Sequence, residues 1–281
     1  MNLLTRSLVC VAAIGLCAGA TTPLNADRTV VSFSDPSRPG TLVVRIVMGS
    51  INIKGADVKE VTIDSHTRDN FHGPVPPDSE EESASRGLRR LTQGTSITVE
   101  ERENRMTIES PVITRPADME IQVPRRTNLQ LSSVNAGNIT VDGVDGELEV
   151  SNVNGAITLT NVGGSVVAHT VNGRVVAKLL RVTPQKSMAF TSLNGAVDVS
   201  LPPTAKANLR LRSDNGSIFT DFDLHILPDS PSPVSEDTRG DGEGGRYKIE
   251  VNKAIYGAVN GGGPEIEART FNGNVYLRKG G

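Results

Sequence analysis

The chain of 281 residues contains no tryptophan, only three tyrosines and six phenylalanines, and only two cysteines. Both cysteines, Cys10 and Cys17, lie near the N-terminus, within positions 1–20, so disulfide bonds and cysteine-ligated zinc are excluded from the remaining sequence. The shortage of aromatic residues argues against the stacking platforms on which proteins hold nucleic-acid bases or sugar rings. These absences leave polar and charged side chains as the expected means of recognition.

An excess of positive charge is also missing, because 29 Lys and Arg residues face 32 Asp and Glu residues and give a formal charge of −3. Basic residues cluster only in short pairs such as Arg89-Arg90 and Arg125-Arg126. Binding to a phosphate backbone needs a basic stripe, so no nucleic-acid partner is predicted. No apolar run approaches the roughly 20 residues of a membrane-spanning helix, so no transmembrane segment is predicted.

The N-terminal segment, positions 1–20, has the pattern of a secretory signal peptide. Arg6 supplies the positive charge, residues 8–16 are apolar, and Ala18-Gly19-Ala20 forms a small-residue cleavage site. Residues 1–20 are therefore predicted to direct export to the periplasm or the cell exterior, and residues 21–27 to form a linker. Lipid attachment at Cys17 is the alternative, but Leu16 occupies a position where a lipoprotein signal needs a small residue.

Four consecutive segments of nine residues span positions 145–180 and read DGELEVSNV, NGAITLTNV, GGSVVAHTV and NGRVVAKLL. A fixed period of this kind is the mark of stacked repeats. The opening Asn-Gly pair returns later in the chain, and it predicts turns because glycine tolerates a positive φ at a corner. The predicted turn residues are Asn154, Gly155, Asn172, Gly173, Asn194, Gly195, Asn215, Gly216, Asn272 and Gly273.

Apolar residues occupy the fourth, sixth and ninth positions of each unit. A spacing of two is the spacing of a β-strand, so the fourth and sixth residues are predicted to enter the core and the fifth to face outward. The ninth residue is predicted to add an inward apolar wedge at the next bend. The inward residues are Leu148, Val150, Val153, Ile157, Leu159, Val162, Val166, Ala168, Val171, Val175, Ala177 and Leu180, and the outward ones are Glu149, Thr158, Val167 and Val176.

Stacked copies of a strand and a turn bury one another where a single copy cannot, which predicts an all-β fold of the parallel β-solenoid type. Two units, about 18 residues, are expected to form one coil, and later coils to lengthen to about 21 or 22 residues. The alternative is a sandwich of antiparallel hairpins, because Asn-Gly is also a strong hairpin signal. Stacked calcium sites of the β-roll type are excluded because the sixth residue of each unit is apolar rather than aspartate.

Residues 28–281 are predicted to form one domain. Its flanking strands are expected at residues 41–47, 51–54 and 58–65, and three more between residues 97 and 123, the last at 119–123. Two polar insertions, at about residues 68–94 and 228–245, have the composition of loops. They contain the candidate surface-binding residues Glu80, Glu81 and Glu82 in the first insertion and Arg239, Gly240 and Asp241 in the second.

The chain resembles the exported bacterial "putative adhesin" family, a domain of unknown function built from short hydrophobic β-strand repeats. The resemblance is carried by Gly49 to Gly55, by Met119 to Val141, by the Asn-Gly repeats and by Gly257 to Glu267. It implies an envelope-exposed solenoid with adhesin-like or envelope-stress associations. It brings no catalytic residues with it.

The histidines and paired carboxylates of the sequence do not have the spacing or surroundings of a metal site or a catalytic site. His66 and His72 lie six positions apart beside a proline-rich loop, a poor spacing for a metal site, and His169 falls at an outward position. Paired carboxylates occur at Glu147 and Glu149 and at Asp142 and Asp145, but no feature of the sequence raises the pKa of one of them, as glycan cleavage requires. No cofactor, metal or catalytic residue is predicted.

The leading hypothesis is a non-enzymatic, exported, adhesin-like solenoid that binds an envelope glycan or protein, or another cell surface, through its repetitive polar face and its loops. The first alternative is a structural or regulatory envelope module that binds a partner protein or an envelope-active peptide. The second is a glycan-cleaving enzyme on a β-helix scaffold. A monomer is predicted, because Arg278 and Lys279 are expected to guard the last strand as an exposed edge.

Overall fold

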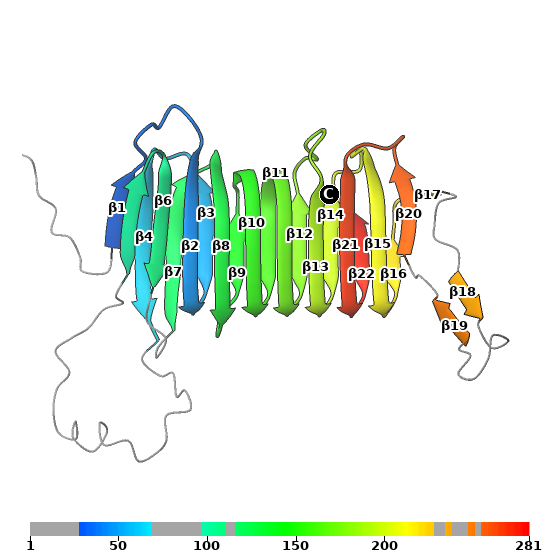
Figure 1. Ribbon diagram of the computed structural model, residues 1–281. Coiled ribbons are helices and arrows are strands. Elements are labelled where there is room, and N and C mark those ends of the chain that lie inside the picture. Colours follow the sequence, from blue (N-terminus) through cyan, green and yellow to red (C-terminus); the bar gives the residue numbers. More distant parts are fainter. Residues whose placement is uncertain are drawn as a thin grey trace, which may run out of the picture.

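The computed structural model describes residues 28–68, 97–110, 116–227, 234–237, 247–250 and 254–280. The predicted signal peptide and linker lie outside these residues. The described chain contains 22 strands and no helix, and it forms a curled sheet with mixed strand orientation (Figure 1). None of the described residues form a helix long and apolar enough to cross a membrane.

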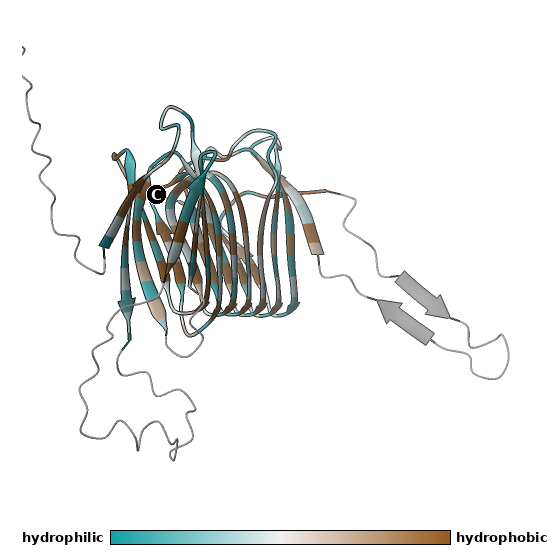
Figure 2. Cartoon of the chain, turned by 60° about the vertical axis from the view of Figure 1, so that its left-hand side comes forward, coloured by the Kyte–Doolittle hydropathy of each residue, from teal (hydrophilic) through white to brown (hydrophobic). Residues whose placement is uncertain are grey.

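The curled sheet has two walls that face each other across the core (Figure 2). The front wall runs in the spatial order β5 (Thr98–Arg102), β6 (Arg105–Ser110), β2 (Gly40–Met48), β8 (Thr127–Asn135), β10 (Asp145–Asn154), the second part of β11 (Ile157–Asn172), β13 (Met188–Asn194), β21 (Glu265–Asn272), β15 (Ala207–Asn215), β20 (Ala254–Val259) and β17 (His225–Ile226).

The rear wall runs in the order β1 (Arg28–Ser32), β4 (Glu60–Thr67), β7 (Ala117–Pro124), β3 (Ile51–Ala56), β9 (Ile139–Asp142), the first part of β11, β12 (Val175–Leu179), β14 (Val197–Leu201), β22 (Val275–Lys279) and β16 (Ile218–Thr220). A separate antiparallel pair is formed by β18 (Val234–Asp237) and β19 (Tyr247–Glu250), and β18 falls within the second insertion, which the sequence predicts as loop.

Parallel pairing dominates the middle of both walls. Val150 of β10 lies beside Ala168 of β11, and Ala168 lies beside Phe190 of β13. Like positions of β10, β11 and β13 are therefore 18 and then 22 positions apart in the sequence. The flanking strands expected at residues 41–47, 51–54 and 119–123 are also present, as β2, β3 and β7.

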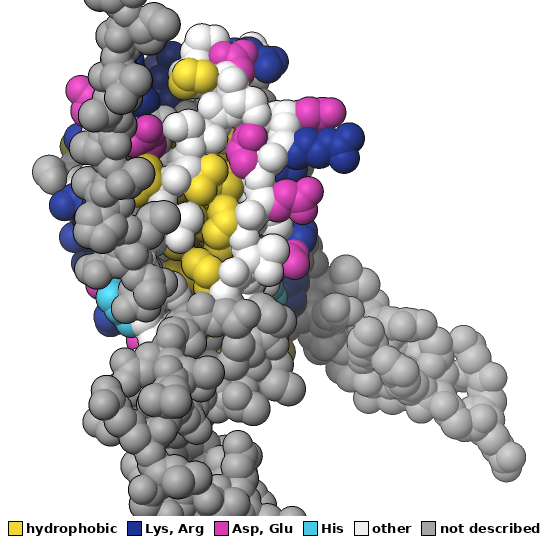
Figure 3. Space-filling view, turned by 90° about the vertical axis from the view of Figure 1, so that its left-hand side faces the viewer, with side chains coloured by type: hydrophobic (Ala, Val, Ile, Leu, Met, Phe, Trp, Pro, Cys, Tyr) yellow, Lys and Arg dark blue, Asp and Glu magenta, His cyan; other side chains and the backbone are white. Residues whose placement is uncertain are grey.

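Antiparallel strands lie at the N-terminal end of both walls and at the C-terminal end of the front wall, whereas the rear wall ends there with β16, which pairs parallel with β22. At the N-terminal end β1 pairs with β4 and β5 with β6, and at the other end β20 pairs antiparallel with β15 and β17. Figure 3 faces the N-terminal end, where hydrophobic side chains lie in the centre among polar and charged ones. Val31 and Val99 pack against the core there and remain partly exposed, so the antiparallel strands cover the end of the core incompletely.

Segments near both ends of the described chain are inserted between other strands of the walls. Strands β2 and β3 lie between β6/β7 and β8/β9, and β21 and β22 lie between β13/β14 and β15/β16. The prediction that the last strand is an edge guarded by Arg278 and Lys279 is therefore wrong, because β22 pairs with strands on both sides. The outermost strand of the rear wall is β16, and the monomer stays a prediction.

The alternation of apolar and polar residues correctly predicts the core at the fourth and sixth positions of the nine-residue units. All eight residues at these positions are buried. The prediction that the ninth residue points inward is wrong in three units, because Val153 and Val171 are partly exposed and Leu180 is 62% exposed. The reason is strand geometry, because alternation carried on through β10, β11 and β12 turns the eighth residue inward and the ninth outward. Only Val162, which follows a register shift in β11, is buried.

The inward eighth residue belongs to a buried row of polar side chains in the front wall. Each member donates a hydrogen bond of 2.7–3.1 Å to a glycine carbonyl in the turn of the neighbouring coil. A buried carbonyl without a partner costs free energy, so the row stabilises the stacking of the turns. The row consists of Ser133, Asn152, Thr170, Ser192, Thr270 and Ser213, which bind Gly49, Gly137, Gly155, Gly173, Gly195 and Gly273 in that order.

The substitution Thr170→Val should lower the free energy of unfolding by about 1–2 kcal/mol, because it leaves the partly buried Gly155 carbonyl without its donor. Urea unfolding measures the loss. The matched control is Thr158→Val on the same strand, which forms no side-chain hydrogen bond among the described residues and should change stability by no more than about 0.5 kcal/mol. Equal losses in both variants would contradict the assigned role of Thr170.

Candidate functional site

The two walls are joined at a tight-turn end and at a loop end, which have opposite characters (Figure 1). The tight-turn end holds the Asn-Gly turns between β10 and β11, between β11 and β12, and between β13 and β14. The loop end holds longer connections, such as those between β1 and β2, between β12 and β13, and between β20 and β21. The candidate residues of the sequence are divided between the tight-turn end and the two insertions.

The predicted turn asparagines form a ladder along the tight-turn end. In the order given below, the side-chain amide of every member after the first donates one hydrogen bond of 2.7–2.9 Å to the side-chain oxygen of the asparagine before it. The ladder therefore already uses the oxygen of most members, and its role is to hold neighbouring turns in register. Its order is Asn135, Asn154, Asn172, Asn194, Asn272 and Asn215.

The predicted positive φ is present in two of the glycines that follow these asparagines, Gly195 (158°) and Gly273 (153°), but a second reason, close stacking, applies to all of them. Positive φ does not explain Gly155, Gly173 or Gly216, none of which has it. A Cβ atom on Gly173 would lie 2.1 Å from the carbonyl oxygen of Gly155, and a Cβ atom on Gly155 would lie 2.0 Å from that of Gly137. The turns stack so closely that only glycine fits between them.

The candidate binding residues of the two insertions lie outside the described residues. This applies to Glu80, Glu81 and Glu82 and to Arg239, Gly240 and Asp241, and it applies to His72 as well. Of the other histidines, His169 is exposed at an outward position and contacts the Thr191 hydroxyl at 2.7 Å. The described part of the chain holds no cluster of three His, Cys, Asp or Glu residues suited to a metal.

The loop end contains a groove made of three cavities in a row. The first, of about 340 Å³, and the second, of about 240 Å³, share Pro39 and Arg126 in their walls. The second and the third, of about 430 Å³, share Arg181. These shared residues make the three cavities one surface feature, the loop-end groove, which follows the stacking direction of the strands.

Positive charge is concentrated in the loop-end groove. Seven basic and three acidic residues line it, a net charge of +4 in a chain whose formal charge is −3. Its potential therefore favours an anionic ligand. The basic residues are Arg38, Lys59, Arg125, Arg126, Arg181, Lys186 and Lys206, and the acidic ones are Asp57, Asp145 and Glu147.

Some of these cations are paired and others are open to a ligand. Arg181 forms a two-pronged ion pair with Asp145, and Lys186 pairs with Glu147. Lys59, Arg126 and Lys206 are exposed and form no ion pair within the described chain. The sequence did not reveal this group, because its members are far apart along the chain and only Arg125-Arg126 stands out as a local pair.

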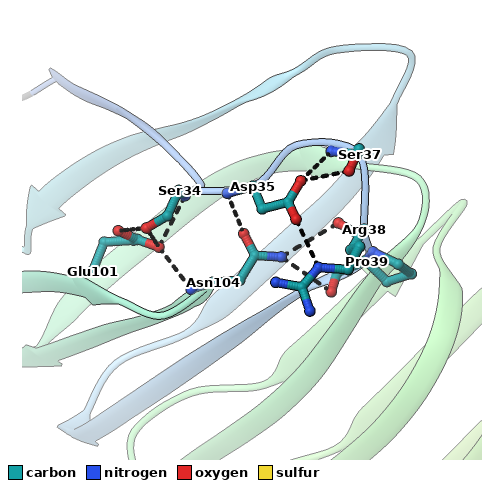
Figure 4. Close-up of polar contacts among 7 residues, drawn as sticks. All are labelled: Ser34, Asp35, Ser37, Arg38, Pro39, Glu101 and Asn104. Atoms are coloured by element: carbon teal, nitrogen blue, oxygen red, sulfur yellow. Dashed lines mark hydrogen bonds and ion pairs between the residues drawn. The ribbon is translucent and has the colours of Figure 1, made fainter.

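The loop between β1 and β2 forms one wall of the first cavity, and the β5–β6 turn holds it in place (Figure 4). The side-chain oxygen of Asn104 accepts the Asp35 amide at 2.9 Å, and its nitrogen lies 3.4 Å from the carbonyls of Arg38 and Pro39. Glu101 accepts the amide and hydroxyl of Ser34. The position of Arg38 in the groove therefore depends on contacts with a strand pair that is distant in the sequence.

Two carboxylates of this anchor are stabilised in their charged form. Hydrogen bonds from Ser37, first from its hydroxyl, and from Arg38 lower the pKa of Asp35 to about 2. The hydroxyl of Ser34 lowers the pKa of Glu101 in the same way. Because hydrogen bonds to a carboxylate favour ionisation, both groups keep their contacts at neutral pH and lose them as the pH falls through their lowered pKa values.

The substitution Asn104→Gly should release the β1–β2 loop while keeping the positive φ of 65° that Asn104 adopts. The backbone amides of Asp35, Ser37 and Arg38 should then exchange with solvent about tenfold faster or more, because the loop can open without breaking the side-chain hydrogen bonds of Asn104. Hydrogen exchange measures this. The control is Asn161→Gly, which has a φ of 54° and an exposed side chain, and which should leave these amides unchanged. Unaltered exchange in Asn104→Gly would show that the loop is held by other contacts.

Comparison with known proteins gives distant similarities. No family model and no curated protein matches the chain. A crystal structure of a "putative cell adhesion protein" from Clostridium sporogenes ATCC 15579 matches with 10% identity and a TM-score of 0.44, covering 90% of this chain and 99% of that one. A "putative adhesin" from Bacteroides fragilis NCTC 9343 matches with 10% identity and a TM-score of 0.32, covering 90% and 95%. Both scores are below 0.5, so neither similarity assigns a function to this chain.

Proposed function

We propose that the protein is an exported, non-enzymatic, adhesin-like β-solenoid that binds an elongated acidic component of a cell envelope or cell surface in its loop-end groove. The observation that carries the proposal is the row of three cavities lined by seven basic residues in an otherwise acidic chain. The pattern of residues 1–20 supports export.

The solenoid assignment is supported by the middle of the two walls. There the chain passes repeatedly from the front wall to the rear wall, and each passage places like residues in register with the one before. The antiparallel strands at both ends have the place of capping elements, which solenoids need because their terminal coils expose unpaired edges.

The shape and charge of the groove support an extended anionic ligand over a small one. Each cavity is lined by at least one cation that forms no ion pair within the described chain. These cations are Lys59 and Arg126 in the first cavity, Arg126 in the second and Lys206 in the third. A polymer with a charge on each repeating unit would meet several of these cations at once, and individually weak contacts would add along its length. Acidic polysaccharides have this chemistry.

A binding role is favoured over glycan cleavage by the surroundings of the carboxylates. Asp145 and Glu147 are each engaged by a cation, and Asp142 accepts hydrogen bonds from Thr160 and Asn161. Oxygen atoms of these carboxylates are thus engaged by neighbouring side chains, whereas a glycosidase needs a pair of carboxyl groups that act on the glycosidic bond. Asp145 and Glu147 therefore position two basic side chains of the groove, Arg181 and Lys186.

The double variant Lys59→Glu/Arg126→Glu should bind acidic polysaccharide at least about tenfold more weakly than the unaltered protein, because two open cations of the groove become anions. Binding to immobilised polygalacturonate and heparin at low salt measures the effect, with neutral dextran as the reference polymer. Affinity for the acidic polymers should also fall steeply as salt is added.

The matched control is Lys54→Glu/Lys178→Glu, which changes the net charge equally on exposed outward positions of the rear wall. It should bind nearly as well as the unaltered protein. An equal loss in this control would mean that overall charge, and not the groove, governs binding. Retention by neither acidic polymer would overturn the proposal and favour a protein partner.

A further inference from the structure

The loop-end groove stops at the loop between β1 and β2, residues 33–39. This loop leaves β1, the outermost strand of the rear wall, and crosses to β2 in the front wall, so it lies across the line of the groove (Figure 1). No residue of the described strands beyond it, β1, β4, β5 and β6, lines any of the three cavities. The loop is therefore the end wall of the groove, and it lines the first cavity with Phe33, Pro36, Ser37, Arg38 and Pro39.

The end wall is held in place at several points. Phe33 is 5% exposed and belongs to the core, and its ring packs so closely on Gly40 that a Cβ atom there would lie 2.6 Å from it. Between these two residues Asp35 forms an ion pair of 2.7 Å with Arg38, and Asn104 of the β5–β6 turn accepts the Asp35 amide (Figure 4). A ligand that continued past the end wall would have to break these contacts.

Positive charge without an ion pair is concentrated beside the end wall. Lys59 and Arg126 line the first cavity and pair with no carboxylate in the described chain, and Arg125, which contacts the Gly143 carbonyl at 3.5 Å, adds a third charge. One acidic residue, Asp57, faces them. In the second and third cavities the cations without an ion pair are single residues, Arg126 and Lys206. The closed end of the groove is thus the place where an anionic group meets several such cations together.

The size and lining of the first cavity suit one small part of a ligand. Its volume of about 340 Å³ lies near the lower limit of the roughly 300–1,000 Å³ that is usual for small-molecule sites. Apolar side chains make up the rest of its lining, as such sites require for contact with the body of a ligand. They include Pro36, Pro39, Val58 and Pro124.

We propose that the groove binds the end of an acidic polysaccharide chain, with the terminal acidic residue in the first cavity against the end wall. The residues that follow it extend toward the second and third cavities. An internal segment is excluded from the first cavity, because the polymer on its other side would collide with the end wall, and such a clash gives specificity. This inference rests on the proposed function, since it specifies which part of the polymer occupies the same groove.

The number of protein copies bound per chain tests the inference. Short, medium and long polygalacturonate chains of defined length are titrated with the protein at low salt, and sedimentation measures the stoichiometry. One copy per chain is expected at every length, because a chain has one end of the recognised kind. Chemical modification of that end, either by reduction of the reducing end or by introduction of a double bond at the other, should weaken binding about tenfold or more.

The substitution Asn104→Gly tests the role of the end wall. Release of the loop should admit internal segments, so more than one copy of this variant should bind a long chain. The matched control Asn161→Gly should keep one copy per chain. The urea midpoint of each variant verifies that it is folded. One copy of Asn104→Gly per long chain would contradict the assignment of the loop as a stop.

The same titration separates failure of this inference from failure of the proposed function. Copies per chain that grow in proportion to chain length, or equal binding after modification of either end, would overturn end recognition and leave the groove as a binding site for acidic polymers. Absence of binding to chains of every length would overturn both proposals.

Discussion

The close stacking of successive turns at the tight-turn end is the constraint on which the rest of the structure depends. A buried hydroxyl or amide of each coil donates to the glycine carbonyl of the neighbouring turn, and the exposed asparagine ladder runs alongside. Glycine is required because a Cβ atom would overlap the carbonyl of the adjacent turn. A strand that shifted by one residue would lose both sets of bonds and turn its apolar side chains outward, so the register of both walls is fixed from this end.

This constraint explains why the opposite end carries the candidate groove. Connections at the tight-turn end have no freedom to vary, since each must fit between two others. Connections at the loop end are free of that requirement, and they contribute Arg38, Lys59, Arg126 and Lys206 from four different places in the sequence. Regular backbone at one end and variable side chains at the other is the usual division between a scaffold and its binding surface.

Local sequence patterns predict the local features of the fold, and long-range features escape them. Alternation identifies the buried residues of β10, β11 and β12, because a strand exposes its two faces in strict turn. It fails at Val153 and Val171, since nothing local states that the strand continues to the Asn-Gly turn. The turn residues are identified for only part of the reason. The Asn-Gly dipeptide shows that glycine can adopt a positive φ, as Gly195 and Gly273 do, but it does not show how closely a neighbouring turn approaches.

The insertion of segments from near both ends of the described chain is the feature that sequence patterns could least predict, and the proposed groove needs the first of these insertions. Placing β3 between β7 and β9 brings Lys59 and Arg38 to the same cavity as Arg125 and Arg126. Placing β22 between β14 and β16 brings Tyr276 to Phe219 and Arg278 to Asp198. Neither arrangement arises if the coils stack in the order of the chain. The step that completes the fold at the N-terminal end therefore also assembles the groove that we assign to binding.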